Sequence, residues 1–235
     1  MYRFKILGMC LVVVFSLGII SCDDSDGSRR AGEAFIRVLH DSCDAPPVDV
    51  LLDDLLAIAD LSYPDVVPDE FYVGVESGAT NVKVNVAGTE TTVIEADLQL
   101  APDTDYTIIA TDFVEFIDAL VLVDDNSPPA TGNVKVRVVH GAPSAPEVDV
   151  YVTAPGVDIN DLEPVLSDVP FTAVSAYLEI PEGEYVIRVT LAGTKDVAIG
   201  PVEVTFVDGQ IRTVVARDDE GCGSPFSLKF LVDAN

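Results

Sequence analysis

The sequence predicts an all-β protein built from two tandem β-sandwiches, and two observations lead to this prediction. The first is an internal repeat: Arg37–Val50 and Arg137–Val150 are identical at 8 of 14 positions, which indicates one domain used twice. The second is the alternation of apolar and polar residues, as in Val82–Val86 and Tyr185–Leu191, which is typical of half-buried antiparallel strands. No segment shows a convincing helical period.

The first residues resemble a bacterial lipoprotein signal. Arg3 and Lys5 precede an apolar run of 15 residues, Ile6–Ile20, which is shorter than the roughly 20 residues that span a bilayer. A small residue then precedes Cys22. The resemblance implies a signal peptide over 1–21, cleavage before Cys22, and acylation of that cysteine with palmitate or a similar chain. The alternative is an ordinary secretory signal or a short anchor helix. The polar segment 22–34 is expected to be a disordered tether.

The spacing between the repeats separates packed strands from loops. His40 and His140 are 100 positions apart, but the spacing grows to 109 at the closing LVDDN and LVDAN motifs. Inserted residues are best tolerated in surface loops, so the blocks of constant spacing are the expected strands. We expect sandwiches over 35–126 and 134–235, with a linker over 127–133.

The strands of each sandwich are expected to be short and separated by frequent turns. About seven strands per 100 residues predict an immunoglobulin-like antiparallel β-sandwich in each repeat. The segment Leu51–Ala59 has enough apolar residues for a turn or two of helix. Its counterpart contains Pro155 and Gly156, so we expect a connection there instead.

The composition excludes some classes of partner. The formal net charge is −27, and removal of residues 1–21 takes away two basic residues and no acidic one, which gives −29. Such a surface repels nucleic acid and anionic headgroups, so no nucleic-acid partner is expected. With 49% hydrophobic residues, two domains of about 100 residues each can bury real cores.

The repeated motif also suggests a family. The pattern (I/V)-x-V-(L/V)-H-x4-A-P-x-V-D-V occurs at Ile36–Val50 and Val136–Val150, and each copy continues to an AGT turn and an LV-acid strand. These features resemble a bacterial domain of unknown function, DUF 4397, over Phe35–Val123 and Val134–Val232. The resemblance implies the sandwich fold and a tandem arrangement on secreted or lipid-anchored proteins, and it implies no established activity.

Four residues of the repeated motif are expected to be structural. Strand alternation places His140 at the end of the apolar face, and His40, the chain's other histidine, is its counterpart in the first repeat. We expect a ring nitrogen of each to donate to a loop carbonyl before the Ala-Pro turn. A metal site would need two or three more ligands, and only Cys43 is near, so no metal or cofactor is expected. Asp49 and Asp149 are expected to face the outer side of the sheet and to fix the register of the paired strands.

The remaining polar residues indicate no catalytic centre. Arg37 and Arg137 alternate out of phase with their valine neighbours, so we expect exposed ion pairs worth under about 1 kcal/mol. The acidic loops lack the ligand spacing of a calcium-binding loop, although weak cation binding stays open. The chain has no nucleophile elbow, phosphate-binding glycine loop or dinucleotide fingerprint. No catalytic residue is therefore assigned.

Two cysteines remain after the signal peptide and the lipid are accounted for. Cys43 and Cys222 lie in non-equivalent loops of different repeats, and an exported protein meets an oxidising compartment. If each sandwich has an odd number of reversing strands, both thiols lie at the junction between the repeats. We therefore hypothesise a disulfide that joins the two domains; the alternative is two free thiols.

These features favour a non-enzymatic protein of the bacterial cell envelope. We expect membrane attachment through the lipid on Cys22, to the inner or the outer membrane, and a binding or structural role toward a protein or glycan partner. One alternative is an adhesin-like surface protein that binds cations or glycans through its acidic loops. Another is a hydrolase or metal-dependent enzyme with an open pocket formed by His40, Asp41 and Cys43.

Overall fold

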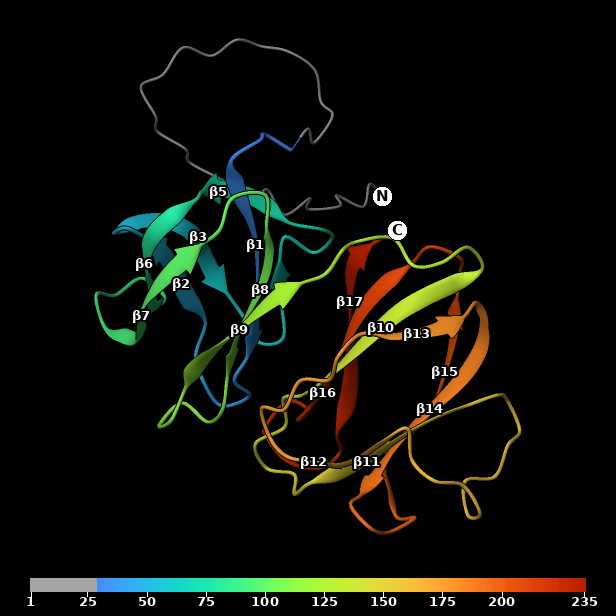
Figure 1. The fold of residues 1–235 in the computed structure, drawn as a ribbon. Helices are drawn as coiled ribbons and strands as arrows, with labels where there is room; N and C mark the ends of the chain where they lie inside the picture. Colours follow the sequence, from blue (N-terminus) through green and yellow to red (C-terminus); the bar gives the residue numbers. More distant parts are fainter. Residues whose placement is uncertain (1–28) are drawn as a thin grey trace, which may run out of the picture.

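The computed structural model describes residues 29–235, which form 17 strands and no helix (Figure 1). The signal peptide expected over 1–21, the lipid site Cys22 and most of the tether expected over 22–34 lie outside the described residues. Among the described residues there is no helix of the length and hydropathy that a membrane span requires. The strands fall into two sandwiches, one for each repeat, as the alternation predicts.

The first repeat contains two sheets that enclose one core. The outer sheet has the order β3-β2-β6-β7, and the inner sheet has the order β4-β1-β8-β9, with β5 also paired to β1. The strands are β1 (Glu33–Asp41), β2 (Val48–Leu52), β3 (Leu55–Leu61), β4 (Val66–Val67), β5 (Val73–Glu76), β6 (Gly78–Val86), β7 (Thr92–Leu100), β8 (Asp105–Thr111) and β9 (Asp118–Asp124).

The second repeat has the same plan. Its outer sheet has the order β12-β11-β14-β15, and its inner sheet has the order β13-β10-β16-β17. The strands are β10 (Asn133–His140), β11 (Val148–Thr153), β12 (Leu166–Val169), β13 (Leu178–Pro181), β14 (Gly183–Leu191), β15 (Val197–Phe206), β16 (Ile211–Arg217) and β17 (Ser227–Ala234).

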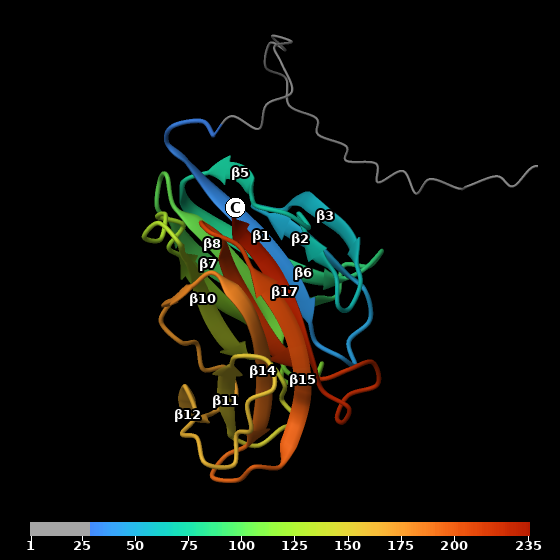
Figure 2. The ribbon, with the colours of Figure 1, turned by 90° about the vertical axis from the view of Figure 1, so that its right-hand side faces the viewer.

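The two inner sheets face each other, so the molecule has four layers (Figures 1 and 2). One face of β1 and β8 packs on the outer sheet through residues such as Val38 and Ile108. The opposite face of these strands, with Leu39 and Ile109, packs on Val139 of the second repeat. Strands β1, β8 and β10 are therefore buried on both faces, whereas β7 and β15 alternate between buried and exposed positions, as expected of sheets with one solvated face.

One strand pair in each repeat runs parallel. Strand β1 pairs with β8 in parallel, and β10 pairs with β16 in the same way. All other paired strands within 29–235 are antiparallel. The parallel pairs place the first strand of each repeat in the centre of its inner sheet, where it meets the other repeat.

The prediction of a connection at Leu51–Ala59 was wrong, because this segment forms the β2–β3 hairpin. Asp53 and Asp54 at its tip both have positive φ, of 48° and 63°, which is the backbone of a two-residue hairpin turn. Aspartate adopts this conformation more readily than most residues. Leu55 and Leu56, which follow the turn, are 74% and 57% exposed, so no alternation revealed the strand.

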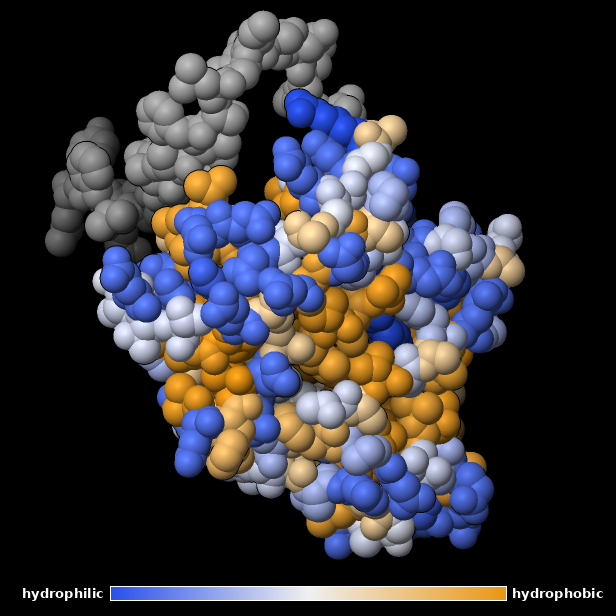
Figure 3. Space-filling view, turned by 60° about the vertical axis from the view of Figure 1, so that its left-hand side comes forward, coloured by the Kyte–Doolittle hydropathy of each residue, from blue (hydrophilic) through white to orange (hydrophobic). Residues whose placement is uncertain are grey.

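Large apolar side chains are also exposed elsewhere on the described surface. Phe116 and Val123 are each more than half exposed. Figure 3 shows a broad band of apolar side chains across the middle of one face of the molecule, with hydrophilic residues above and below it. Hydrophilic side chains are therefore not spread evenly over this face.

Candidate functional site at the interface between the repeats

The interface between the inner sheets has an apolar part that both repeats supply. Leu39, Ile109 and Leu122 of the first repeat pack against the second, and each is 6% exposed or less. Their partners from the second repeat are Val139, Val215 and Leu231. This cluster has the composition of a domain core, which indicates a permanent contact and not a transient one.

A buried ion pair crosses the interface beside the apolar cluster. The guanidinium of Arg37 donates to Asp233 Oδ1 at 2.6 Å and to the carbonyl of Val232 at 2.8 Å, and both charged side chains are fully buried. Within its own repeat Arg37 donates to Thr107 Oγ1 at 2.7 Å and stacks on the ring of Tyr72. The arginine of the first repeat thus donates hydrogen bonds to the last strand of the second.

The reciprocal pair has the same geometry. Arg137 donates to Asp124 Oδ1 and to the carbonyl of Val123 at 3.2 Å. Within its own repeat Arg137 donates to Thr213 Oγ1 at 2.8 Å and stacks on Tyr177. Each arginine therefore binds the aspartate of the other repeat.

Each aspartate uses its second oxygen within its own repeat. Asp124 Oδ2 accepts from Thr107 at 2.6 Å and from Tyr72 at 2.8 Å. Asp233 Oδ2 accepts from Thr213 at 2.7 Å and from Tyr177 at 3.1 Å. The eight side chains form one hydrogen-bonded network that is symmetric about an approximate two-fold axis.

Burial sets the energetic importance of this network. Burial raises the pKa of the Asp124 carboxyl, and the charge of Arg137 and the hydroxyl of Thr107 act in the opposite direction. Burial also acts to lower the pKa of Arg137, but the charge of Asp124 and the other acidic groups raises it overall. A buried charge left without its partner is strongly destabilising, so the pairs hold the two repeats in one orientation.

The expectation of exposed, weak pairs at Arg37 and Arg137 was therefore wrong. Alternation places both arginines on the face opposite the sandwich core, but that face is covered by the other repeat and not by water. A signal for the network was present in the sequence: arginine, tyrosine, threonine and aspartate recur at equivalent positions in both repeats. The positions are Arg37/Arg137, Tyr72/Tyr177, Thr107/Thr213 and Asp124/Asp233.

The symmetry is broken where Asp41 and Gly141, which occupy equivalent positions, meet across the axis. A Cβ added to Gly141 would lie 2.5 Å from Asp41 Oδ2 and 2.9 Å from Val215 Cγ1, so a side chain there would require Asp41 and Val215 to move. Both carboxylate oxygens of Asp41 are buried and have no hydrogen-bond partner within the described structure. Burial raises the pKa of Asp41 well above its usual value, and Arg217 opposes this effect.

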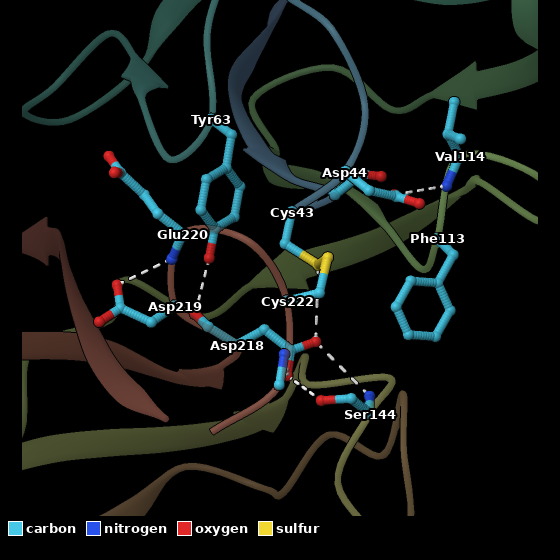
Figure 4. The surroundings of a disulfide bond; sticks show 12 residues. Cys43, Asp44, Tyr63, Phe113, Val114, Ser144, Asp218, Asp219, Glu220 and Cys222 are labelled. Carbon is cyan, nitrogen blue, oxygen red and sulfur yellow. Dashed lines mark hydrogen bonds between the residues drawn. A yellow bond between two sulfur atoms is a disulfide. The ribbon is translucent and has the colours of Figure 1, made fainter. Parts of the chain in front are cut away.

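A disulfide joins the repeats at one end of the interface (Figure 4). It links Cys43 to Cys222, with a Cα–Cα distance of 5.3 Å. The loop around Cys222 is held by further contacts between the repeats, since Tyr63 donates to the carbonyl of Asp218 at 2.6 Å. Within the second repeat, Ser144 also donates to the Asp218 carboxylate. Burial raises the pKa of Tyr63 to about 12, so this donor keeps its proton at neutral pH.

The two histidines are buried and bonded to main chain. His40 is 0% and His140 is 1% exposed. Nε2 of each ring lies 3.1 Å from a proline carbonyl, that of Pro46 or Pro146, and Nδ1 accepts from the main-chain amide two residues further on. These partners require the tautomer that carries its proton on Nε2. Burial lowers the pKa of both rings, which keeps them neutral.

The open pocket that a hydrolase or metal enzyme would need is not formed by the three residues that suggested it. His40 and Asp41 are buried, and Cys43 is part of the disulfide. Cys43, Asp44 and Cys222 do lie within 4.8 Å of one another, but both sulfurs are consumed by the disulfide and are not thiolate ligands.

Asp49 and Asp149 each bridge the edge strand of the outer sheet and the AGT turn. Asp49 accepts from the amides of Asp60 at 2.8 Å and Gly88 at 2.9 Å. Asp149 accepts from the amides of Asp168 and Gly193, both at 2.9 Å. Each carboxylate thus joins the strand after the Ala-Pro turn to the AGT turn. The side chain is used for this link and not for an ion pair with an arginine.

The fold and the interface define a tandem-repeat β-sandwich protein. The chain belongs to the family described as "Domain of unknown function (DUF4397)", whose model matches residues 34–151 and 152–235. The boundary between the two matches falls within β11, whereas the second structural repeat begins at β10. No curated protein matches the sequence.

Two solved structures are similar at low identity. One belongs to "Alpha-glucan binding by a streptococcal virulence factor", with 14% identity, a TM-score of 0.29, and coverage of 85% of this chain and 97% of that chain. The other is "The Bacillus anthracis TIE protein", with 11% identity, a TM-score of 0.24, and coverage of 79% of this chain and 34% of that one. Likenesses of this size carry no information on what this chain binds.

Proposed function

We propose that this protein is a non-enzymatic, lipid-anchored module of the bacterial cell envelope whose two repeats act as one rigid binding or structural unit. The observation that supports this most strongly is the reciprocal pairing of Arg37 with Asp233 and of Arg137 with Asp124. The disulfide adds a covalent link to the same interface. An extended scaffold with two solvated outer sheets suits presentation of a surface to a protein or glycan partner.

The absence of a base among the histidines supports the non-enzymatic part of the proposal. A general base needs a free nitrogen within reach of a substrate proton. Both nitrogens of His40 and His140 are instead engaged with main chain inside the fold. These rings position the Ala-Pro turns of the two repeats.

The lipid anchor is supported by the sequence of the first 22 residues. Strand β1 begins at Glu33, 11 positions after Cys22. At about 3.3 Å per extended residue, that segment would allow the folded part to stand roughly 36 Å from the membrane. The charge of the mature chain would keep it away from anionic headgroups.

Mass spectrometry of the chain isolated from bacterial membranes tests the anchor. We expect an N-terminal fragment that begins at Cys22 and carries acyl chains. A Cys22→Ala chain should lack this mass and should incorporate no labelled palmitate. An unmodified Cys22, or a mature chain that begins elsewhere, would rule the anchor out.

Spin-label distance measurements test the rigid unit. Nitroxides placed at Glu95 and Glu203, which are exposed on the two outer sheets, should give one narrow distance distribution in the full chain. The Arg37→Met/Arg137→Met variant should broaden it, because both crossed pairs are lost. A broad distribution in the unmodified chain would contradict the proposal of a single rigid body.

A further inference from the structure

A cavity lies inside the second sandwich, between its inner and outer sheets. Its volume is about 120 Å³, and aliphatic and aromatic side chains from all eight strands of the repeat or their flanks line it. The lining residues that are no more than 8% exposed are Val136, Val138, Val150, Ile187, Val189, Phe206 and Val214. No charged residue contributes to the lining.

The cavity reaches the surface beside β12. Val165 contributes to its wall and is 48% exposed, while Leu178 and Ile180 of β13 are half-buried on the other side. The one hydroxyl in the wall, that of Tyr185, already donates to the carbonyl of Pro181 at 2.8 Å. Water in such a cavity would find no partner, so the cavity is expected to stay dry unless an apolar ligand enters it.

The first repeat fills the corresponding region differently. Tyr106 of β8 is 6% exposed and packs in the core with Ile36 and Leu100. Its counterpart Arg212 has its guanidinium bonded to the carbonyls of Ile211 and Ala234 at the end of the inner sheet. The second core instead has its buried aromatic ring at Phe206, the position of Leu100 in the first repeat.

Two smaller differences also reduce the side-chain volume in the second core. Ile36 and Ile108 of the first repeat correspond to Val136 and Val214, which both line the cavity. Each replacement removes one methylene from the wall. Other wall positions are larger in the second repeat, such as Phe206 against Leu100 and Leu228 against Ala119, so the space reflects how the whole wall packs and not side-chain size alone.

We propose that this cavity binds the end of a hydrocarbon chain, about six carbon atoms long, that enters between β12 and β13. The size fits, because apolar cavities of about 150 Å³ stay dry and bind benzene. A polar head would remain in solvent beside Val165, since no buried donor or charge is present to receive it. The source is either a free hydrocarbon or the tail of a neutral amphiphile. This inference is independent of the lipid anchor on Cys22.

The test uses the chain of residues 23–235, secreted without lipid from a non-lipoprotein signal so that no detergent is needed. Every strand and core cluster of the described structure lies within this range. We expect n-hexane to raise the Tm and to cause saturable shifts of the methyl signals of Val138 and Val189. Absence of saturable shifts up to the solubility limit of hexane would overturn the proposal.

A second arm identifies the source of the chain. Octyl glucoside below its micelle concentration should shift the same methyl signals if the natural ligand is an amphiphile tail. Shifts with hexane alone would assign the cavity to free hydrocarbons. Both results support a hydrocarbon site, and they distinguish its two sources.

Matched substitutions locate the site. Val189→Leu fills part of the cavity and should weaken hexane binding several-fold with little change in Tm. Val84→Leu adds the same methylene at the equivalent position of the first repeat and should leave binding unchanged, with a lower Tm from overpacking of the filled first core. Val136→Ile/Val214→Ile, which copies the first repeat, should also weaken binding. Equal binding by all four proteins would contradict the assignment.

Discussion

Arg37 and Asp233 are 196 positions apart in the chain, yet they form a fully buried ion pair across the interface between the repeats. The equivalent residues Arg137 and Asp124 form the second pair in the opposite direction. Each arginine makes its shortest ion pair with the other repeat, whereas Arg37 lies 3.9 Å from Asp124 of its own repeat. The interface is therefore part of the fold of each sandwich, and not only a contact between two finished domains.

Loss of one partner of this pair should be costly. Arg37→Met leaves the Asp233 charge buried, so we expect a loss of about 3–5 kcal/mol in the free energy of unfolding, measured with urea. The double variant Arg37→Met/Asp233→Asn should recover part of this loss. As a control, Lys83→Met removes an exposed pair with Asp54 and should hardly change the unfolding midpoint. An equally small effect of Arg37→Met would contradict the structural role.

Removal of the disulfide should lower stability without abolishing the fold. The bridge closes a loop with a sequence separation of 179, for which a chain-entropy estimate gives about 5 kcal/mol. Cys43→Ala/Cys222→Ala should lower the urea midpoint and should make it insensitive to reductant. The unmodified chain should lose a similar amount when reduced. If reductant has no effect on the unmodified chain, the bridge is not formed in solution.

The buried carboxyl of Asp41 should make stability fall as the pH rises. Its pKa in the folded chain is raised, so the folded state binds the proton more tightly than the unfolded state does. Stability from this group is present below about pH 4 and is lost as the pH rises toward the folded pKa, by up to about 1.4 kcal/mol per pH unit. Asp41→Asn should flatten this dependence and increase stability at pH 7. An unchanged or lower stability at pH 7 would argue against an unpartnered carboxylate.

The histidines should have the opposite effect on the pH dependence. Burial lowers the pKa of His40 and His140, so the unfolded state binds protons more readily. The contribution of the neutral histidines to the free energy of unfolding is complete above about pH 6.5. It is lost as the pH falls from the pKa of the unfolded state toward the lower pKa of the folded state. The double variant His40→Gln/His140→Gln should show a weaker decline of stability between pH 7 and 5. The measurement is urea unfolding at each pH, and an unaltered slope would contradict this assignment.

The carboxylates of Asp49 and Asp149 should protect specific main-chain amides from hydrogen exchange. Asp49→Ala removes the acceptor for the amides of Asp60 and Gly88, and it should cost about 1–3 kcal/mol. Hydrogen exchange should accelerate at Gly88 and not at Gly193, which depends on Asp149. Asp149→Ala should give the reverse pattern. Uniform acceleration in both repeats would indicate global destabilisation instead of a local link.

The sequence was sufficient to predict the repeats and the sandwich fold because both depend on local patterns. Alternation at Val82–Val86 reports directly on a strand with one solvated face, and that strand is found in β6. The hairpin after Leu52 was missed because its leucines are exposed, so period two does not appear there. Alternation identifies the residues that share a face, but it does not identify what covers that face.

The interface could not be predicted for the same reason. Arg37 and Thr107 lie on the face opposite the core, where polar residues usually meet water, and the second repeat covers them instead. The parallel pairing of β1 with β8 also depends on contacts distant in sequence. The cavity in the second repeat could not be predicted either, because a hydrophobic pattern registers neither side-chain size, as in Ile108 against Val214, nor the space left between packed side chains.

The reciprocal exchange of arginine and aspartate has the form of an isologous dimer contact. Each half presents the same donor and the same acceptor to the other, so the contact is self-complementary, as it is between two copies of one subunit. Because both halves belong to one polypeptide, their association does not depend on protein concentration. A molecule diluted over a cell surface would keep the quaternary arrangement that separate subunits lose when they are scarce.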